Sequence, residues 1–206
     1  MDDVREVVFS SKGLRLEGLL EGPPGRRGAV ITHPHPLFGG NMYNNVVEAL
    51  NRGYREAGYT TLRFNFRGAG MSEGRFDEGI GEQDDVKAAL DYLEEQGVSP
   101  LALAGYSFGA WVSALALAKL PRVARLVMVS PPVAVLDFGF LGYDPRVKLV
   151  VAGSRDDIAP ADRIEILVKE WNPDATFCMI PGADHFYGGS AGEITRVLKE
   201  LLESGA

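Results

Sequence analysis

Apolar positions along the chain follow two patterns that alternate with each other. Short runs that are almost wholly apolar, such as residues 28–33, are typical of strands covered on both faces of a sheet. Other segments repeat their apolar residues at helical spacing: Val86, Ala89, Leu90 and Leu93 lie at i, i+3, i+4 and i+7 and form one stripe. This alternation predicts an α/β fold, in which a mostly parallel central sheet has helices on both faces.

The pattern assigns most of the chain to regular elements. Strands are expected at residues 4–10, 14–20, 28–33, 60–65, 101–106, 123–129, 148–152 and 176–180, and helices at residues 44–57, 82–96, 108–119, 161–170 and 193–203. The first two strands flank the turn Ser11-Lys12-Gly13, which predicts an antiparallel hairpin at the N-terminus. No repeat occurs, and no linker is long enough to divide the chain, so residues 1–206 are expected to form a single domain.

The composition narrows the classes of protein to consider. Hydrophobic residues make up 46% of the 206 positions and charged residues 24%, which provides for a packed core and excludes a chain that is mainly disordered. The formal net charge is −7 and no basic block occurs, so no nucleic-acid partner is expected. The single cysteine, Cys178, excludes an intramolecular disulfide and a cysteine-rich metal site.

The chain has no pattern typical of a membrane protein or a secreted one. It begins Met1-Asp2-Asp3-Val4, which has the wrong charge for a signal peptide, and no apolar run follows. No stretch reaches the roughly 18 apolar residues of a membrane span. We therefore expect a cytoplasmic protein that has no membrane partner.

The motif G-x-S-x-G occupies residues 105–109, between an expected strand and an expected helix. A serine at such a turn has a strained backbone, and its hydroxyl is exposed at the carboxyl edge of the sheet. The helix that follows directs its N-terminal N–H groups at the same place, which favours a developing negative charge. Ser107 is therefore the candidate nucleophile, and the alternative is an incidental serine in a glycine-rich turn.

A serine hydroxyl needs a base, and the base needs a group that orients it. Of the three histidines, His33 and His35 follow one strand together, whereas His185 follows the last expected strand. Asp156 and Asp157 lie in the loop after the strand before that one. The order along the chain, serine then aspartate then histidine, is that of a catalytic triad.

Four further motifs occur in a fixed order around the serine. They are His-Pro-His-Pro-Leu-Phe-Gly-Gly at residues 33–40, Phe-Asn-Phe-Arg-Gly-Ala-Gly-Met-Ser-Glu-Gly at residues 64–74, the G-x-x-D-x-x-x-P stretch at residues 153–160, and Gly-Ala-Asp-His at residues 182–185. With these motifs nearly the whole chain resembles the α/β-hydrolase superfamily. It is most similar to the small bacterial serine hydrolases without a lid, which include carboxylesterase, serine-aminopeptidase-like and dienelactone-hydrolase-like proteins.

The resemblance implies roles for the residues near the base. It makes Asp156 the acid, since this residue lies three positions after the glycine that ends its strand, and His185 the base. Asp157 is then a loop carboxylate that pairs with Arg155 or caps the next helix, and Asp184 shapes its loop. Dienelactone hydrolases of this fold usually have a cysteine nucleophile, whereas position 107 is serine, so dienelactone specificity is not expected.

Acyl transfer builds negative charge on a carbonyl oxygen, and preorganised N–H groups stabilise that charge. One expected donor is the backbone N–H of Phe108, directly after the nucleophile. The other is expected from residues 33–40, where the two prolines have no N–H to donate, which leaves His35, Leu37 or Phe38. The resemblance favours His35, with Leu37 as the alternative.

No cofactor and no metal ion is expected. His33 and His35 lack a third ligand at suitable spacing nearby, so we interpret His33 as a structural residue that forms hydrogen bonds. Gly68 and Gly70 follow a strand, but the position of the third glycine in a dinucleotide-binding motif is occupied by Glu73. The phosphate-binding motif G-x-x-x-x-G-K-[ST] does not occur in the sequence.

Residues 130–146 separate two expected strands and are too few for a multi-helix cap, so a minimal lid or none is expected. The segment is rich in apolar side chains, and we expect it to wall a shallow apolar acyl pocket together with side chains from other loops. The residues expected there are Phe38, Leu136, Phe138 and Phe186, with Leu37, Val133, Phe140, Leu141 and Tyr143. The alternative is that the segment packs onto the core.

These features together predict a metal-independent serine hydrolase. Small carboxylic esters are the expected substrates, and thioesters or short peptide amides are the alternatives. A second class of function is a non-catalytic member of the fold that binds a ligand or a partner. The expected partner is a small-molecule ester, and the chain is expected to be a monomer or a homodimer.

Overall fold

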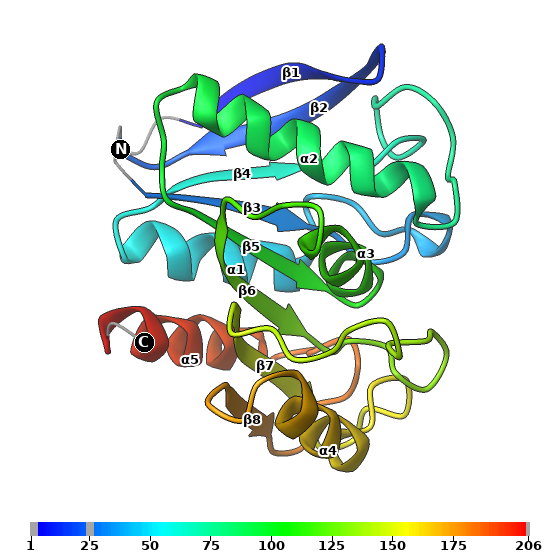
Figure 1. Ribbon diagram of the computed structural model, residues 1–206, viewed down its shortest axis with the longest axis vertical. Coiled ribbons are helices and arrows are strands. Elements are labelled where there is room, and N and C mark those ends of the chain that lie inside the picture. Colours follow the sequence, from blue (N-terminus) through cyan, green and yellow to red (C-terminus); the bar gives the residue numbers. More distant parts are fainter. Residues whose placement is uncertain (1–3, 24–26, 205–206) are drawn as a thin grey trace.

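The computed structural model describes residues 4–23 and 27–204, and within them eight strands form one sheet (Figure 1). The strands are β1 (Arg5–Ser11), β2 (Leu14–Glu21), β3 (Gly28–Thr32), β4 (Thr60–Phe64), β5 (Leu101–Tyr106), β6 (Val123–Val129), β7 (Val147–Gly153) and β8 (Thr176–Ile180). Their order across the sheet is β1-β2-β4-β3-β5-β6-β7-β8. Strands β3 to β8 are parallel to one another, so the predicted mostly parallel sheet is confirmed.

The N-terminal hairpin is antiparallel, as the sequence predicts. Its turn contains Lys12 with φ of +49° and Gly13 with φ of +88°, and two such left-handed residues match the right-handed twist of the paired strands. Ser11 pairs with Leu14, so Ser11 belongs to β1 and not to the turn. Strand β2 also pairs antiparallel with β4, and the hairpin thereby extends the parallel sheet at one side.

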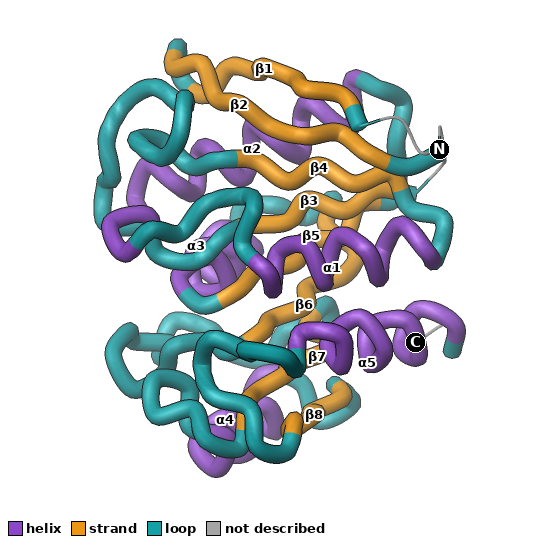
Figure 2. Tube along the Cα trace, turned by 180° about the vertical axis from the view of Figure 1, so that it is seen from behind, coloured by secondary structure: helices purple, strands orange, loops and turns teal. Residues whose placement is uncertain are grey.

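Five helices of the described residues cover the sheet: α1 (Asn45–Glu56), α2 (Ile80–Glu95), α3 (Phe108–Leu117), α4 (Ala161–Trp171) and α5 (Ala191–Glu203). Helices α2, α3 and α4 lie over the face turned to the viewer in Figure 1. Helices α1 and α5 lie side by side over the opposite face, which Figure 2 shows. Each face has its own apolar core, with Leu90 and Trp171 buried in one, and Leu50 and Leu198 buried in the other.

Helix α2 begins at Ile80, two residues before the acidic run at which the sequence predicts its start. The carboxylate of Glu82 accepts hydrogen bonds from the N–H groups of Asp77 and Gly79, at 2.8 and 2.9 Å. Glu82 thus caps the helix from inside its first turn, and the true start lies upstream. The sequence pattern also does not predict the short 3₁₀ helix η1 (Pro36–Phe38).

The connection between β6 and β7, residues 130–146, contains neither a helix nor a strand. This edge of the sheet therefore has no helical lid, as predicted. Among the described residues, every helix is too short or too polar to cross a lipid bilayer.

The carboxyl ends of the parallel strands meet at one edge of the sheet, to which the arrowheads of β3, β5 and β6 point in Figure 1. The loops after β3, β5, β6, β7 and β8 leave from this edge. In that order, these loops carry His35, Ser107, Ser130, Asp156 and His185. In open α/β sheets this edge is where ligands bind, so the fold gathers the chemically active side chains at one place.

Candidate active site

Ser107 occupies the turn between β5 and α3, with φ of +53° and ψ of −120°. This left-handed backbone is strained for a residue with a side chain. The two glycines of the motif make the turn possible. A Cβ on Gly105 would lie 2.5 Å from the carbonyl oxygen of Gly109, and a Cβ on Gly109 would lie 2.6 Å from the carbonyl oxygen of His33. The glycines therefore allow α3 to pass close to β5 and to the end of β3.

The structure brings Ser107, His185 and Asp156 together, although they lie in three separate loops. Ser107 Oγ is 2.9 Å from His185 Nε2. His185 Nδ1 is 2.9 Å from each carboxylate oxygen of Asp156. All three side chains are buried. Because Nδ1 faces a carboxylate it donates its proton there, which leaves Nε2 free to accept the proton of the serine hydroxyl.

The surroundings of Asp156 keep its carboxylate charged and fixed. Oδ1 accepts hydrogen bonds from the N–H groups of Ile158 at 3.0 Å and Ala159 at 2.8 Å. Oδ2 accepts one from Ser130 Oγ at 2.7 Å. Burial by itself raises the pKa of the Asp156 carboxyl, but the hydrogen bonds from His185, Ser130 and Ala159 and the charge interaction with His185 together outweigh burial and hold this pKa below its ordinary value.

The other two aspartates of these loops, Asp157 and Asp184, have different environments from Asp156. Asp157 is exposed to solvent, whereas Asp156 faces the histidine, so the geometry agrees with Asp156 as the orienting acid. Asp184 Oδ1 accepts hydrogen bonds from the N–H groups of Phe186 at 3.0 Å and Tyr187 at 3.1 Å. Asp184 therefore shapes the loop that carries His185.

Three hydroxyl groups around the histidine and the aspartate are not singled out by the sequence pattern. Tyr106 OH donates to the backbone carbonyl oxygen of His185 at 2.5 Å. Ser130 Oγ lies 2.7 Å from Tyr187 OH as well as from Asp156. A usable signal is position: Ser130 follows β6, which lies between the strands that precede Ser107 and Asp156, so its loop emerges between them.

The loop after β3 is folded so that one of its N–H groups stays available. The N–H of Leu37 donates to His35 Nδ1 at 3.2 Å, and the N–H of Phe38 donates to the carbonyl oxygen of His35 at 3.1 Å. Within residues 4–23 and 27–204, no hydrogen bond occupies the N–H of His35 or the N–H of Phe108. The rings of His35 and Phe108 lie 4.9 Å apart by their centroids, and both residues line the same cavity as Ser107.

His33 has a structural role, as its sequence context predicts. Its Nε2 accepts a hydrogen bond from the N–H of Phe66 at 3.0 Å, and its Nδ1 donates to the carbonyl oxygen of Pro34 at 2.6 Å. Complete burial lowers the pKa of His33 to about 4, so the ring is neutral. In the described part of the chain, no group of three His, Cys, Asp or Glu side chains is placed to hold a metal ion.

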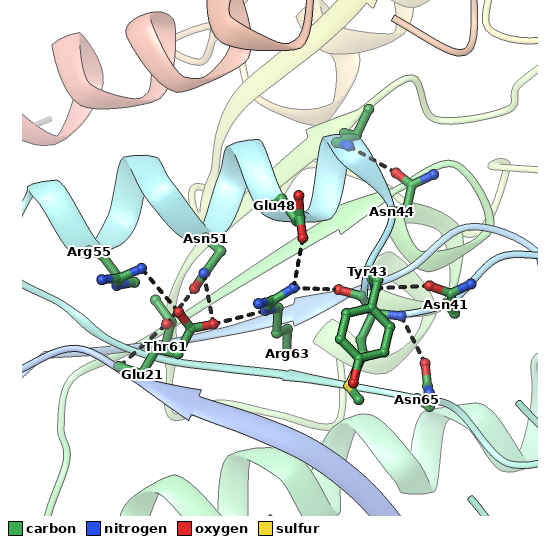
Figure 3. A network of polar contacts seen from close by, with 12 residues as sticks. Glu21, Asn41, Tyr43, Asn44, Glu48, Asn51, Arg55, Thr61, Arg63 and Asn65 are labelled. Carbon is green, nitrogen blue, oxygen red and sulfur yellow. Dashed lines mark hydrogen bonds and ion pairs between the residues drawn. The ribbon is translucent and has the colours of Figure 1, made fainter. Parts of the chain in front are cut away.

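A network of polar contacts holds the segment that joins η1 to α1 (Figure 3). Arg63 donates to the carbonyl oxygen of Met42 at 3.0 Å and pairs with Glu21 at 2.9 Å. Asn65 Oδ1 accepts a hydrogen bond from the N–H of Met42 at 2.8 Å. Asn44 caps α1 by accepting from the N–H of Val46. The segment between η1 and α1 is therefore anchored to β4 and β2.

A cavity of about 700 Å³ opens beside Ser107. Its lining residues are Pro34, His35, Phe38, Gly39, Gly40, Asn44, Tyr106, Ser107, Phe108, Pro132, Val135, Leu136, Ile158, His185 and Phe186. Of the nine residues expected at the pocket, Phe38, Leu136 and Phe186 are among them, whereas Leu37, Phe140 and Tyr143 are not. No Asp, Glu, Lys or Arg side chain of the described residues lines this cavity.

The prediction that Phe138 lines the pocket is wrong. This side chain is only 4% exposed, and its ring packs on Trp171 at a centroid distance of 5.4 Å. Val133 is also buried in the core, and Leu141 packs against it. The segment between β6 and β7 therefore fulfils both expectations at once: part of it packs onto the core, and Leu136 with its neighbour Val135 faces the cavity.

Comparisons with known proteins agree with this architecture. The sequence model of the family described as the Alpha/beta hydrolase family matches residues 29–202. An uncharacterized protein of Rickettsia prowazekii is 35% identical over 209 residues, covering 96% of this chain and 88% of that protein.

Solved structures of other proteins are also similar over nearly their whole length, among them a serine hydrolase homologue and a serine hydrolase. An alpha-beta serine hydrolase homologue from Coxiella burnetii is 36% identical with a TM-score of 0.88, covering 95% of this chain and 96% of that one. XC6422 from Xanthomonas campestris, a member of the a/b serine hydrolases without a lid, is 30% identical with a TM-score of 0.90, covering 98% of this chain and 95% of that one.

Proposed function

Because the chain belongs to the α/β-hydrolase family, we propose that it is a serine hydrolase that cleaves carboxylic esters with an uncharged acyl group. One observation carries the proposal: hydrogen-bonding distances of 2.9 Å connect Ser107 Oγ to His185 and His185 to Asp156 without a break. Such a chain of contacts activates an alcohol that is otherwise a weak nucleophile.

The proposed reaction proceeds through an acyl-enzyme. Ser107 Oγ attacks the ester carbonyl carbon while His185 Nε2 takes the hydroxyl proton, and the Asp156 carboxylate stabilises the imidazolium that forms. The tetrahedral intermediate collapses when His185 gives that proton to the departing alcohol, which leaves the acyl group on Ser107. Water then attacks the acyl-enzyme with His185 as base, and the carboxylic acid departs as the serine is restored.

The N–H groups of Phe108 and His35 are the proposed oxyanion hole. Both are unoccupied within the described residues, and both belong to residues that line the cavity beside Ser107. Leu37 is the weaker candidate because its N–H already donates to His35 Nδ1. One such donor typically contributes about 10²-fold to 10³-fold to kcat.

The absence of charge on the cavity wall supports an uncharged acyl group. A substrate with a carboxylate or an ammonium group near the acyl carbon would bury a charge that no lining residue of the described chain pairs with, and an unpaired buried charge is costly. Peptides with a free α-ammonium group are therefore the weaker alternative. Thioesters share the uncharged acyl group and stay the alternative substrate.

Covalent labelling tests the nucleophile. A phosphonate directed at serine nucleophiles should increase the mass of the wild-type protein by one adduct, which peptide mapping should locate at Ser107. Ser107→Ala should not react, whereas Ser113→Ala, which removes a buried serine of α3, should react like the wild type. Unchanged ester hydrolysis by Ser107→Ala would overturn the mechanism, and it would leave ligand or partner binding as the function to test.

A matched set of esters tests the acyl group. The p-nitrophenyl esters of butyrate, of succinate with its second carboxylate free, and of 4-aminobutyrate have similar size and the same leaving group. The expected kcat/KM for butyrate exceeds that for either charged ester by about 100-fold. Equal rates would contradict the proposed preference for an uncharged acyl group, but they would leave Ser107 as the proposed nucleophile. A series of esters from acetate to decanoate would measure how deep the acyl site is.

A further inference from the structure

Ser130 and Tyr187 combine three features that separate them from the rest of the core. Both are completely buried. Both have a left-handed backbone, with φ of +43° for Ser130 and +54° for Tyr187, which is a strained conformation for a residue with a side chain. Their hydroxyl groups are 2.7 Å apart, next to Asp156. At position 130 a glycine would remove the strain, so a strained serine in its place suggests that the hydroxyl is used.

The hydrogen atoms of this cluster can be assigned by counting. Ser130 has one hydroxyl proton, which it donates to Asp156 Oδ2 at 2.7 Å. The contact between Ser130 Oγ and Tyr187 OH then needs its proton from Tyr187. The direction of donation therefore runs from Tyr187 to Ser130 to Asp156. Burial raises the pKa of the Tyr187 hydroxyl, so Tyr187 keeps the proton that this chain requires.

Ser130, Tyr187 and Asp156 are connected to the proposed base, His185, in a closed circuit of hydrogen bonds and backbone. Tyr187 lies two residues after His185, and His185 Nδ1 contacts the same carboxylate that Ser130 contacts. A displacement of the loop with His185 therefore also displaces Tyr187 and, through Ser130, the carboxylate. The titratable groups that face this carboxylate are His185, Tyr187 and Tyr106, and burial raises the pKa of both tyrosines so that they stay uncharged.

We propose that Ser130 and Tyr187 are a positioning pair, which holds the carboxylate of Asp156 in one orientation against His185 Nδ1 through two successive hydroxyl groups. The inference rests on the proposed function, since it concerns the acid of the same reaction. Without the Ser130 hydroxyl, Oδ2 loses its second donor and the carboxylate can rotate away from the bidentate contact with His185. The pair acts on the chemical step through Asp156 and does not touch the substrate.

The effect of Ser130 is separable from stability because two variants remove the hydroxyl with opposite effects on the backbone. Ser130→Ala keeps the strain at φ of +43°, whereas Ser130→Gly releases it. Both variants should lower kcat by roughly 10-fold to 100-fold with KM close to the wild-type value. The part of the acidic limb of kcat/KM that protonation of Asp156 contributes should move to higher pH in both, because the carboxylate binds a proton more readily when it loses a hydrogen-bond donor.

Tyr187→Phe removes only the far hydroxyl and should lower kcat by a smaller factor, roughly 3-fold to 10-fold. Two matched controls apply the same chemical change elsewhere. Ser113→Ala deletes a buried serine hydroxyl in α3, and Tyr54→Phe deletes a buried tyrosine hydroxyl that has no hydrogen-bond partner in the described chain. Both controls should keep the wild-type kcat and pH profile.

Phosphonate labelling of each variant separates the possible failures. A wild type that is labelled at Ser107, together with Ser130 variants that are labelled as fast and have an unmoved acidic limb, overturns the positioning pair and leaves the proposed function standing. A wild type that is not labelled overturns the proposed function itself. A loss of kcat in Ser130→Ala that Ser130→Gly fully regains would assign the effect to backbone strain, and this result also overturns the pair.

Discussion

The candidate site has two halves that are built in opposite ways. The inner half is a set of buried polar side chains: Ser107, Ser130, Asp156, His185 and Tyr187. The rim is a set of exposed apolar side chains: Phe38, Val135 and Phe186. Direct hydrogen bonds of 2.7 to 2.9 Å hold the inner half together, whereas the rim side chains are 67% to 87% exposed.

This difference assigns different kinds of effect to the two halves. A buried polar group whose partner is removed has no water to replace that partner, so changes in the inner half should be large and should appear in kcat. An exposed apolar side chain loses only contact area when it is shortened, so changes in the rim should be small and should appear in KM.

The sharpest contrast lies within one dipeptide. Asp156→Asn places an amide where Ile158, Ala159, Ser130 and His185 all donate, and an amide that turns its NH₂ toward His185 favours the wrong tautomer. We expect kcat for a p-nitrophenyl ester to fall by roughly 10³-fold to 10⁴-fold. Asp157→Asn, at the exposed neighbour, should keep the wild-type rate. Equal losses in the two variants would show that Asp156 is not the orienting acid.

The next contrast concerns the backbone beneath the inner half. A Cβ on Gly109 would lie 2.6 Å from the carbonyl oxygen of His33 and 2.7 Å from that of Thr32. Gly109→Ala should therefore push α3 away from β3, lower the free energy of unfolding by about 1–3 kcal/mol and lower kcat by roughly 10²-fold. In Gly192→Ala, where the new Cβ meets nothing within 4 Å, denaturant unfolding should show unchanged or higher stability.

The two halves also differ in how far the sequence predicts them. Ser107 belongs to a motif whose glycines the turn requires, and Asp156 and His185 follow strand ends in the order of a catalytic triad. The triad of the inner half can therefore be predicted from the sequence. Of the rim, Phe38 and Phe186 are predicted, whereas Val135 lies in residues 130–146, a stretch without regular structure in which no periodicity fixes the direction of side chains. Phe138 turns inward there, although it is predicted to line the pocket, and Val135, for which the pattern makes no prediction, lines the cavity instead.

Ser130 and Tyr187, which support the inner half, are not predicted from the sequence, and the reason differs from that for Val135. Ser130 and Tyr187 are common residue types that stand in no motif, and their role follows from a strand order that places β6 between β5 and β7. The hairpin, the parallel strands and the helices were predictable because each is specified by a local pattern. Contacts that cross from one strand end to the next need the topology first.

His33, a buried neutral histidine outside the inner half, should make the free energy of unfolding depend on pH. His33 has a pKa of about 4 in the folded protein against about 6.5 in the unfolded chain, so below pH 6.5 the unfolded state binds the extra proton. The free energy of unfolding should therefore fall by about 2 kcal/mol from this residue between pH 7 and pH 5. Asp156, whose pKa is lowered, is ionised in both states over this range and adds nothing.

A substitution isolates that contribution. His33→Gln should be less stable than the wild type at pH 7, because it perturbs the hydrogen bonds to Phe66 and Pro34. Its stability, measured by urea denaturation, should nevertheless change less between pH 7 and pH 5 than that of the wild type. A wild-type and a variant protein with the same pH dependence would indicate that folding does not lower the pKa of His33.

The smallest effect is expected at the rim. Phe38 is 87% exposed, so Phe38→Ala should change the free energy of unfolding by less than about 0.5 kcal/mol. Its ring lines the cavity, and its loss should raise KM for a hexanoate ester by roughly 3-fold to 10-fold while KM for acetate and both kcat values stay close to wild type. Ile166→Ala, at an apolar residue of α4 that is 61% exposed and lies outside the cavity, is the matched control. A fall in kcat on both esters would place Phe38 with the inner half, since its ring lies 4.8 Å from that of His35 and would then be holding the proposed oxyanion donor.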